Sequence, residues 1–145
     1  NEGLYDAIIL SYAGIKSLMI NDKVSEIFST KEIIPRAVQR VIALQCRNND
    51  DEIISILNKV NHNETSQRAY AERNVLKILE GDCETAVGAH ARIEEDKLVL
   101  EAELFSLDGS QRFYEKKSSK IDNAKELGKE VGEALKKKSN NSYKK

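Results

Sequence analysis

The stretch from Leu79 to Ala91 constrains the fold most, because a helical pattern ends within it and a strand pattern begins. The helical pattern runs from about residue 64 to residue 80, and Gly81 is the natural residue to follow the end of a helix. An apolar strand pattern starts at Ala86. Cys83 lies between them, so we expect a loop held by two regular elements to present its thiol.

The neighbours of Cys83 bear on what its thiol can do. Glu80, Asp82 and Glu84 surround it with negative charge, which is expected to raise its pKa, whereas nucleophilic cysteines have cationic neighbours. The pattern favours a thiol that holds a group over one that turns over a substrate. The alternative, a small hydrophobic residue at a helix–strand junction, stays open.

Three strands and a helix are predicted after the loop. The strands span 86–93, 97–105 and 111–117, and Asp108-Gly109 is a tight turn between the last two. In the second strand apolar side chains alternate with polar ones, which predicts an antiparallel strand buried on one side, with Lys97, Glu101 and Glu103 on the other.

Asp122 is expected to cap the final helix, in which Gly128 and Gly132 permit close packing. The predicted fold class is therefore an α+β C-terminal domain over residues 60–138 (helix, three-stranded antiparallel sheet, helix), preceded by an incomplete α/β portion.

Residues 1–59 do not close into a domain by pattern alone. Strands are predicted at 5–10 and 41–47, and short helices around 15–19 and 24–28. A further amphipathic helix over 53–60 has Asp50 as its expected N-cap. A strand leading into a helix is half of a βαβ unit, so we interpret the chain as a fragment.

Composition and charge exclude several classes. Charged residues make up 32% and apolar residues 40% of the 145 residues, and no apolar run is long enough to cross a bilayer. The net charge is −1 although residues 136–145 hold five lysines, so residues 1–135 carry −6, which argues against nucleic acid as a partner. Residues 139–145 are expected to form a disordered basic tail. Cys46 and Cys83 lie in unrelated contexts, which favours free thiols and a cytoplasmic location.

The segment from Leu79 to Gly88 resembles the cofactor-attachment loop of the porphobilinogen deaminase (hydroxymethylbilane synthase) family, which reads roughly Leu-x-Gly-Gly-Cys-x-x-Pro-(Ile/Val)-Gly. Asp82 and Ala86 replace the second glycine and the proline. Further matches occur in the same order along the chain, namely Tyr5-Asp6-Ala7-Ile8-Ile9-Leu10 with Ala13-Gly14-Ile15-Lys16, Glu64-Thr65, Ala71-Glu72-Arg73 and Asp108-Gly109.

The resemblance implies a transferase of tetrapyrrole (heme) biosynthesis that joins four porphobilinogen molecules into hydroxymethylbilane with release of ammonia. It implies that Cys83 carries a dipyrromethane cofactor through a thioether bond in the full-length enzyme. The cofactor would be absent if it was never attached to this chain. Residues 1–40 would end domain 2, residues 41–59 would return to domain 1, and residues 60–138 would form domain 3. The catalytic residues would lie upstream, so we expect no catalytic residue here and no activity from this chain without the N-terminal half, its expected partner. The full-length protein is expected to be a monomer away from membranes.

Departures from the family pattern keep an alternative open, a small non-catalytic α+β domain whose cysteine is unmodified. Ser17 replaces a substrate-facing arginine, and Val38 and Arg40 replace both glycines of a Pro-x-x-Gly-Gln-Gly hinge. If the hinge needs glycine's backbone angles, the loss of both predicts either a changed crossover or backbone strain there. Arg36 and Arg40 are either solvated charges or anion contacts.

Other polar candidates are weaker. His62 is expected on a loop surface, whereas His90 either approaches the cofactor or faces solvent. Cys46 is expected in a core, and Arg47 and Arg73 suit domain-boundary salt bridges as well as substrate contacts. No spacing of these residues predicts a metal site.

Overall fold

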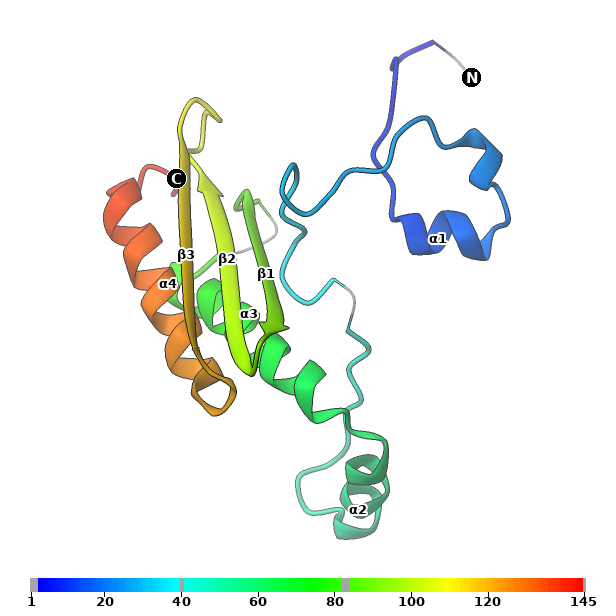
Figure 1. The fold of residues 1–145 in the computed structure, drawn as a ribbon, viewed down its shortest axis with the longest axis vertical. Helices are drawn as coiled ribbons and strands as arrows, with labels where there is room; N and C mark the ends of the chain where they lie inside the picture. Colours follow the sequence, from blue (N-terminus) through cyan, green and yellow to red (C-terminus); the bar gives the residue numbers. More distant parts are fainter. Residues whose placement is uncertain (1–2, 40, 82–83, 145) are drawn as a thin grey trace. The chain divides into compact units, whose positions relative to one another are not determined.

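A computed structural model describes residues 3–39, 41–81 and 84–144 (Figure 1). The chain divides into two compact units, Asn1–Glu32 and Ile33–Lys145, which are described separately. Asp82, Cys83, Arg40 and Lys145 lie outside the described residues.

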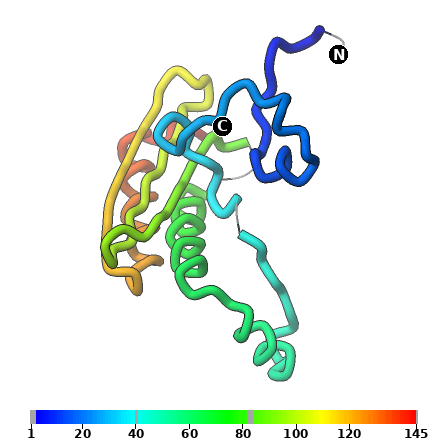
Figure 2. The backbone as a smooth tube through the Cα atoms, turned by 45° about the vertical axis from the view of Figure 1, so that its right-hand side comes forward, coloured from blue at the N-terminus to red at the C-terminus, as the bar shows by residue number. Residues whose placement is uncertain are grey.

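The second unit contains the predicted helix–sheet–helix arrangement. Strands β1 (Val87–Glu94), β2 (Lys97–Phe105) and β3 (Arg112–Lys120) form an antiparallel sheet in the order β1-β2-β3. Helices α3 (Asn63–Leu79) and α4 (Ala124–Ser139) cover one face of it (Figures 1 and 2). The predicted fold class is confirmed. The strand and helix bounds differ from the predicted ones by up to three residues.

The central strand β2 is buried on both faces, which differs from the one-sided burial predicted for it. Leu98, Leu100, Ala102 and Leu104 face the helices with no exposed surface. On the other face Glu101 is only 9% exposed, because Arg92 of β1 and Lys116 of β3 reach across to its carboxylate at 2.7 and 3.0 Å. Ion pairs between neighbouring strands thus cover the polar side of the sheet.

Small residues bring the two helices together, as predicted. A Cβ added at Gly128 would overlap the Ala71 carbonyl oxygen and lie 2.8 Å from Asn74 Cβ, and one at Gly132 would lie 2.8 Å from Ile78 Cβ. The backbone of α4 therefore packs directly on α3, and the core apolar side chains fill the space between this helix pair and the sheet.

Two turns of this unit have clear side-chain causes. Asp108 accepts hydrogen bonds from Ser106 and Ser110, which lower the pKa of its carboxyl to about 2, and Gly109 adopts a φ of 72°. The tight turn predicted there is confirmed. Asp122 does not cap α4, because it lies inside a short 3-10 helix η2 (Ile121–Asn123) that precedes the helix.

The chain after α4 differs from the disordered tail that composition predicts. The Leu107 amide donates to the Ser142 carbonyl at 2.9 Å, and Tyr143 is only 4% exposed. The lysine-rich composition of the tail gives little weight to its one aromatic residue. The Tyr143 side chain nevertheless packs into the core cluster, and its burial orders the tail.

The strands predicted at 5–10 and 41–47 are absent from these stretches as the structure describes them, as is the helix at 24–28. The first unit instead contains α1 (Tyr12–Ser17) and a 3-10 helix η1 (Asn21–Lys23). A strand needs a partner for its backbone groups, and the described part of the chain offers none to these segments. Their apolar side chains are consequently exposed, Ile9 by 74% and Ile42 by 90%.

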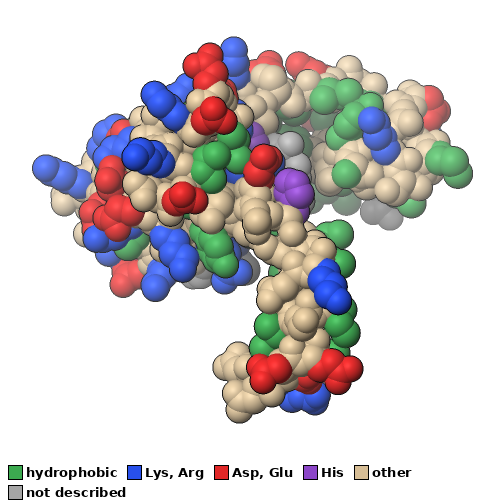
Figure 3. All heavy atoms as spheres, turned by 60° about the horizontal axis from the view of Figure 1, so that its bottom comes forward, with side chains coloured by type: hydrophobic (Ala, Val, Ile, Leu, Met, Phe, Trp, Pro, Cys, Tyr) green, Lys and Arg blue, Asp and Glu red, His purple; other side chains and the backbone are tan. Residues whose placement is uncertain are grey.

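Helix α2 (Asp51–Val60) forms as predicted, and Asp50 caps it by accepting from the Ile53 amide at 3.3 Å. The described residues do not bury the apolar face of α2, since Ile53, Ile56 and Val60 are exposed. The space-filling view shows hydrophobic side chains, in green, on the surface of the segment that contains α2 (Figure 3).

Substitution of Gly128 by alanine tests the helix–helix contact. Because the added methyl overlaps backbone of α3, we expect Gly128→Ala to lower the free energy of unfolding by about 2 kcal/mol or more, measured by urea denaturation. Gly14→Ala, which meets no atom within 4 Å, is the matched control and should not destabilise. Equal stability of Gly128→Ala and wild type would contradict the packing.

Candidate functional site

The loop between α3 and β1 is closed at its base. A Cβ on Gly81 would lie 3.5 Å from Thr85 Cβ, so the chain leaves α3 and returns to β1 at nearly the same point. Leu79, the last residue of α3, has no exposed surface. Cys83, the site residue predicted from sequence, belongs to this loop and lies outside the described residues, so its attachment role stays a prediction.

The residue that caps the C-terminal end of α3 is Glu80 and not Gly81, the residue expected to follow the helix. Glu80, not Gly81, adopts the left-handed conformation, with a φ of 53°. The Glu80 and Gly81 amides donate to the Lys77 and Leu76 carbonyls at 3.3 and 3.2 Å, which satisfies the end of the helix. A non-glycine residue in this region is strained, so contacts around it must hold the backbone there.

Two lysines reach the Glu80 carboxylate from the C-terminal part of the chain. Lys144 hydrogen-bonds to it, and Lys136 Nζ lies 3.5 Å from Glu80 Oε2. These contacts lower the pKa of Glu80, mainly through the Lys144 hydrogen bond, and that bond raises the pKa of Lys144. The acidic surroundings predicted for the loop are thus offset at Glu80 by cations 56 and 64 residues away in sequence.

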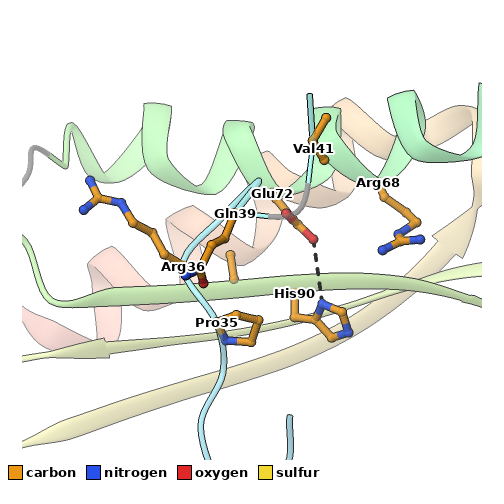
Figure 4. A pocket seen from close by; sticks show the side chains of 8 residues that line it. Pro35, Arg36, Gln39, Val41, Arg68, Glu72 and His90 are labelled. Atoms are coloured by element: carbon orange, nitrogen blue, oxygen red, sulfur yellow. Dashed lines mark ion pairs between the residues drawn. The ribbon is translucent and has the colours of Figure 1, made fainter. Parts of the chain in front are cut away.

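A second feature is a small hollow at the outer edge of β1, where the hinge predicted around Pro35 runs past α3 (Figure 4). His90 is 9% exposed, and its Nδ1 lies 4.0 Å from Glu72 Oε1. A solvent-facing His90 is therefore wrong. The hollow is lined by Pro35, Arg36, Gln39, Val41, Arg68, Glu72, Ala89 and His90.

Glu72 of α3 joins three elements at this hollow. Its Oε1 accepts from the Ala91 amide of β1 and its Oε2 from the Val38 amide of the hinge, both at 2.7 Å. A carboxylate that is only 6% exposed needs hydrogen-bond donors, and these two backbone amides supply them.

The outer edge of β1 is satisfied by groups from outside the sheet. The Ala89 amide donates to the Pro35 carbonyl at 3.0 Å, and Arg68 Nε donates to the Ala91 carbonyl at 2.9 Å. A Cβ on Gly88 would lie 2.6 Å from the Ile34 carbonyl oxygen, so the hinge lies directly against the strand. An edge covered in this way is protected from pairing with another chain.

Of the two alternatives predicted for the hinge, a changed crossover or backbone strain, the structure shows strain at Val38. Val38, at the first glycine position of the family pattern, has a φ of 55°, a value that β-branched residues rarely adopt. The buried Ala37 and the Val38–Glu72 hydrogen bond hold it there. Arg40, at the second glycine position, lies outside the described residues.

The weaker candidates have mostly local structural roles. His62 caps α3, with Nδ1 accepting from the Thr65 amide at 3.3 Å, which sequence reasoning missed because histidine is an uncommon N-cap. Arg47 pairs locally with Asp50 at 2.6 Å. Cys46 is half-buried rather than in a core, and Arg36 and Arg73 are exposed. Within 3–39, 41–81 and 84–144, no cluster of His, Cys, Asp or Glu could hold a metal ion.

Two family models match the chain in sequence order. "Porphobilinogen deaminase, dipyromethane cofactor binding domain" matches residues 1–55, and "Porphobilinogen deaminase, C-terminal domain" matches residues 66–137.

Curated relatives agree with the family models. Proteins named porphobilinogen deaminase from Desulforamulus reducens and Blochmanniella pennsylvanica are 36% and 37% identical over 90% and 87% of this chain. A third from Gloeobacter violaceus is 34% identical over 94%. The chain spans 42% of the length of each.

The Glu72 carboxylate can be tested by removing one acceptor. In Glu72→Gln the amide has one oxygen for two buried N–H donors, so we expect the free energy of unfolding to fall by about 1–3 kcal/mol in urea denaturation. Glu133→Gln, on the exposed side of α4, is the control and should change stability by less than about 0.5 kcal/mol. A neutral effect of Glu72→Gln would argue against the three-element connection.

The strain at Val38 predicts a stabilising substitution. Val38→Gly relieves the left-handed strain but loosens the unfolded chain, so we expect a net gain of about 0.5–1 kcal/mol in the free energy of unfolding. Ala37→Gly, one residue earlier and buried, should instead lower it by about 1 kcal/mol. Both values come from denaturation curves, and a loss of stability in Val38→Gly would contradict strain there.

Proposed function

The chain belongs to the porphobilinogen deaminase family, and on that premise we propose that it supplies the cofactor-carrying domain of a hydroxymethylbilane synthase, with Cys83 as the attachment residue. The observation that carries the proposal is the placement of the Cys83 motif. It falls between α3 and β1, in a loop whose ends meet at Gly81 and Thr85 on a packed helix–sheet scaffold.

The choice of Cys83 over Cys46 needs an argument, because the family model named for cofactor binding matches residues 1–55, which contain Cys46. Cys46 lies in an irregular segment whose neighbours are exposed. Only Cys83 has the attachment motif around it and a rigid element on each side, which is what a covalent anchor requires. We therefore assign the thioether to Cys83.

The described residues beside the loop fit a thioether anchor but not a cradle for a cofactor that bears carboxylates. Such groups are bound by arginines or lysines. Lys136 and Lys144, the cations at the base of the loop, already pair with Glu80. We propose that the cations for the cofactor and for porphobilinogen lie outside these 145 residues. When bound, the cofactor supplies the primer on which the tetrapyrrole chain grows.

The exposed apolar segments support a larger assembly. Residues 4–10, residues 41–44 and the apolar face of α2 all carry exposed aliphatic side chains. Surfaces of this kind need covering in a stable protein. We propose that the N-terminal half of the family fold covers them, and that the complete enzyme is a monomer. The structure has no helix, among the residues it describes, that would span a bilayer. The free Cys46 thiol supports the cytoplasm as the proposed compartment.

The strained hinge favours a second candidate, a non-catalytic domain. Val38 holds a left-handed conformation without the glycine that the family uses, which would follow if the hinge no longer had to move. In that case Cys83 would be a bare thiol in the isolated protein.

Intact mass and peptide mapping distinguish the two candidates. We expect a dipyrromethane-sized mass increase on the peptide that contains Cys83 when the chain is produced with the rest of its protein. Cys83→Ser should abolish the increase, and Cys46→Ser, the matched control, should retain it. A bare Cys83 in the wild type would favour the non-catalytic domain.

The chain alone should show no measurable consumption of porphobilinogen. Turnover by the 145 residues would contradict the proposal that the groups that bind porphobilinogen lie outside them.

A further inference from the structure

The residues after α4 turn back toward the end of α3. Asn140 and Asn141 both adopt left-handed conformations, with φ of 46° and 59°, which asparagine tolerates better than most residues. The Ser142 amide donates to the Ser139 carbonyl at 2.9 Å, and the Lys144 amide to the Asn141 carbonyl at 3.0 Å. This reversal directs the last described residues at the base of the Cys83 loop.

Tyr143 makes the central contact. Its hydroxyl donates to the Leu79 carbonyl at 3.1 Å, and the side chain is almost fully buried. The Leu79 carbonyl is one of the last in α3, where no amide of the same helix is available to donate. Burial raises the pKa of Tyr143, so its hydroxyl keeps the proton that it donates.

Lys144 and Lys136 contact Glu80, the residue after Leu79. Lys144 pairs with the Glu80 carboxylate, and Lys136 Nζ lies 3.5 Å from both Glu80 Oε2 and the Ile78 carbonyl. Cations at a helix C-terminus are favourable because they face its negative end. Here they also hold the side chain of a residue whose backbone is strained.

We propose that residues 140–144 form a C-terminal clamp that fixes Leu79 and Glu80, from which the attachment loop starts, with Tyr143 and Lys144 as positioning residues for the start of that loop. The inference rests on the proposed function only in taking Cys83 as the anchor. The clamp contacts Leu79 and Glu80, the two residues from which the loop starts. A covalent arm moves with the backbone that carries it, so the start of the loop sets where the arm begins.

Hydrogen–deuterium exchange on the whole chain tests the clamp. In Tyr143→Phe the Leu79 carbonyl loses its donor while the ring is kept, so we expect amides at 80–86 to exchange about fivefold faster, as for loss of one net hydrogen bond. Exchange in β1, β2 and β3 should stay within about twofold of wild type. Tyr114→Phe, on exposed β3, is the matched control and should leave the loop unchanged.

A reaction-linked measurement accompanies the exchange. The fraction of chains that carry a dipyrromethane-sized adduct at Cys83 should fall in Tyr143→Phe and stay at the wild-type level in Tyr114→Phe. If Tyr143→Phe does not fold, Lys144→Gln carries the test, because it removes the exposed ion pair to Glu80 and the cation–π contact with the Tyr143 ring but keeps the buried Tyr143 side chain.

Unchanged exchange at 80–86, or an equal rise in every strand, would overturn the clamp, because a purely structural tyrosine would destabilise the whole domain alike. The hydrogen–deuterium exchange result, unlike the adduct fraction, is independent of the proposed function. An adduct-free Cys83 in the wild type would defeat the proposed function, while the exchange pattern would still decide whether the clamp exists.

Discussion

The Glu72 carboxylate is the interaction on which the arrangement around the candidate site depends. It accepts one backbone amide from the hinge and one from β1 while it belongs to α3, so three segments distant in sequence meet at one side chain. A buried carboxylate is costly unless donors surround it, and the two amides are also costly unless an acceptor does. Each group therefore stabilises the position of the others. Because β1 follows the Cys83 loop directly, this fixes where the loop rejoins the sheet.

The other end of the loop is fixed by different chemistry. Leu79 and Glu80 are held from the C-terminal part of the chain by a buried phenol and by lysine–carboxylate pairs, in addition to the hydrogen bonds at the end of α3. Gly81 and Thr85 then close the loop. The described residues on both sides of residues 82–83 are therefore fixed by contacts from outside the loop.

Prediction from sequence succeeded where the determining contacts are local. The Asp108-Gly109 turn and the Asp50 cap both follow from neighbours in the chain. It failed at residues 5–10 and 41–47, because an apolar run becomes a strand only when another strand pairs with it. It also missed Tyr143 and the lysines that neutralise Glu80, since these contacts join residues more than 50 positions apart and no periodic pattern records them.

The hinge shows how contacts can hold a backbone conformation that the residue type itself disfavours. Replacement of glycine by valine at position 38 predicts either a changed crossover or a strained one, and the backbone at Val38 is strained with a φ of 55°. Local preference alone would release that strain by moving Val38 into an extended conformation. Such a move would withdraw its amide from Glu72 and disturb Ala37 and Ile34, which are buried against β1. The conformation is therefore set by contacts with α3 and β1 and not by the hinge sequence, so loss of the glycine motif does not by itself argue against the family fold.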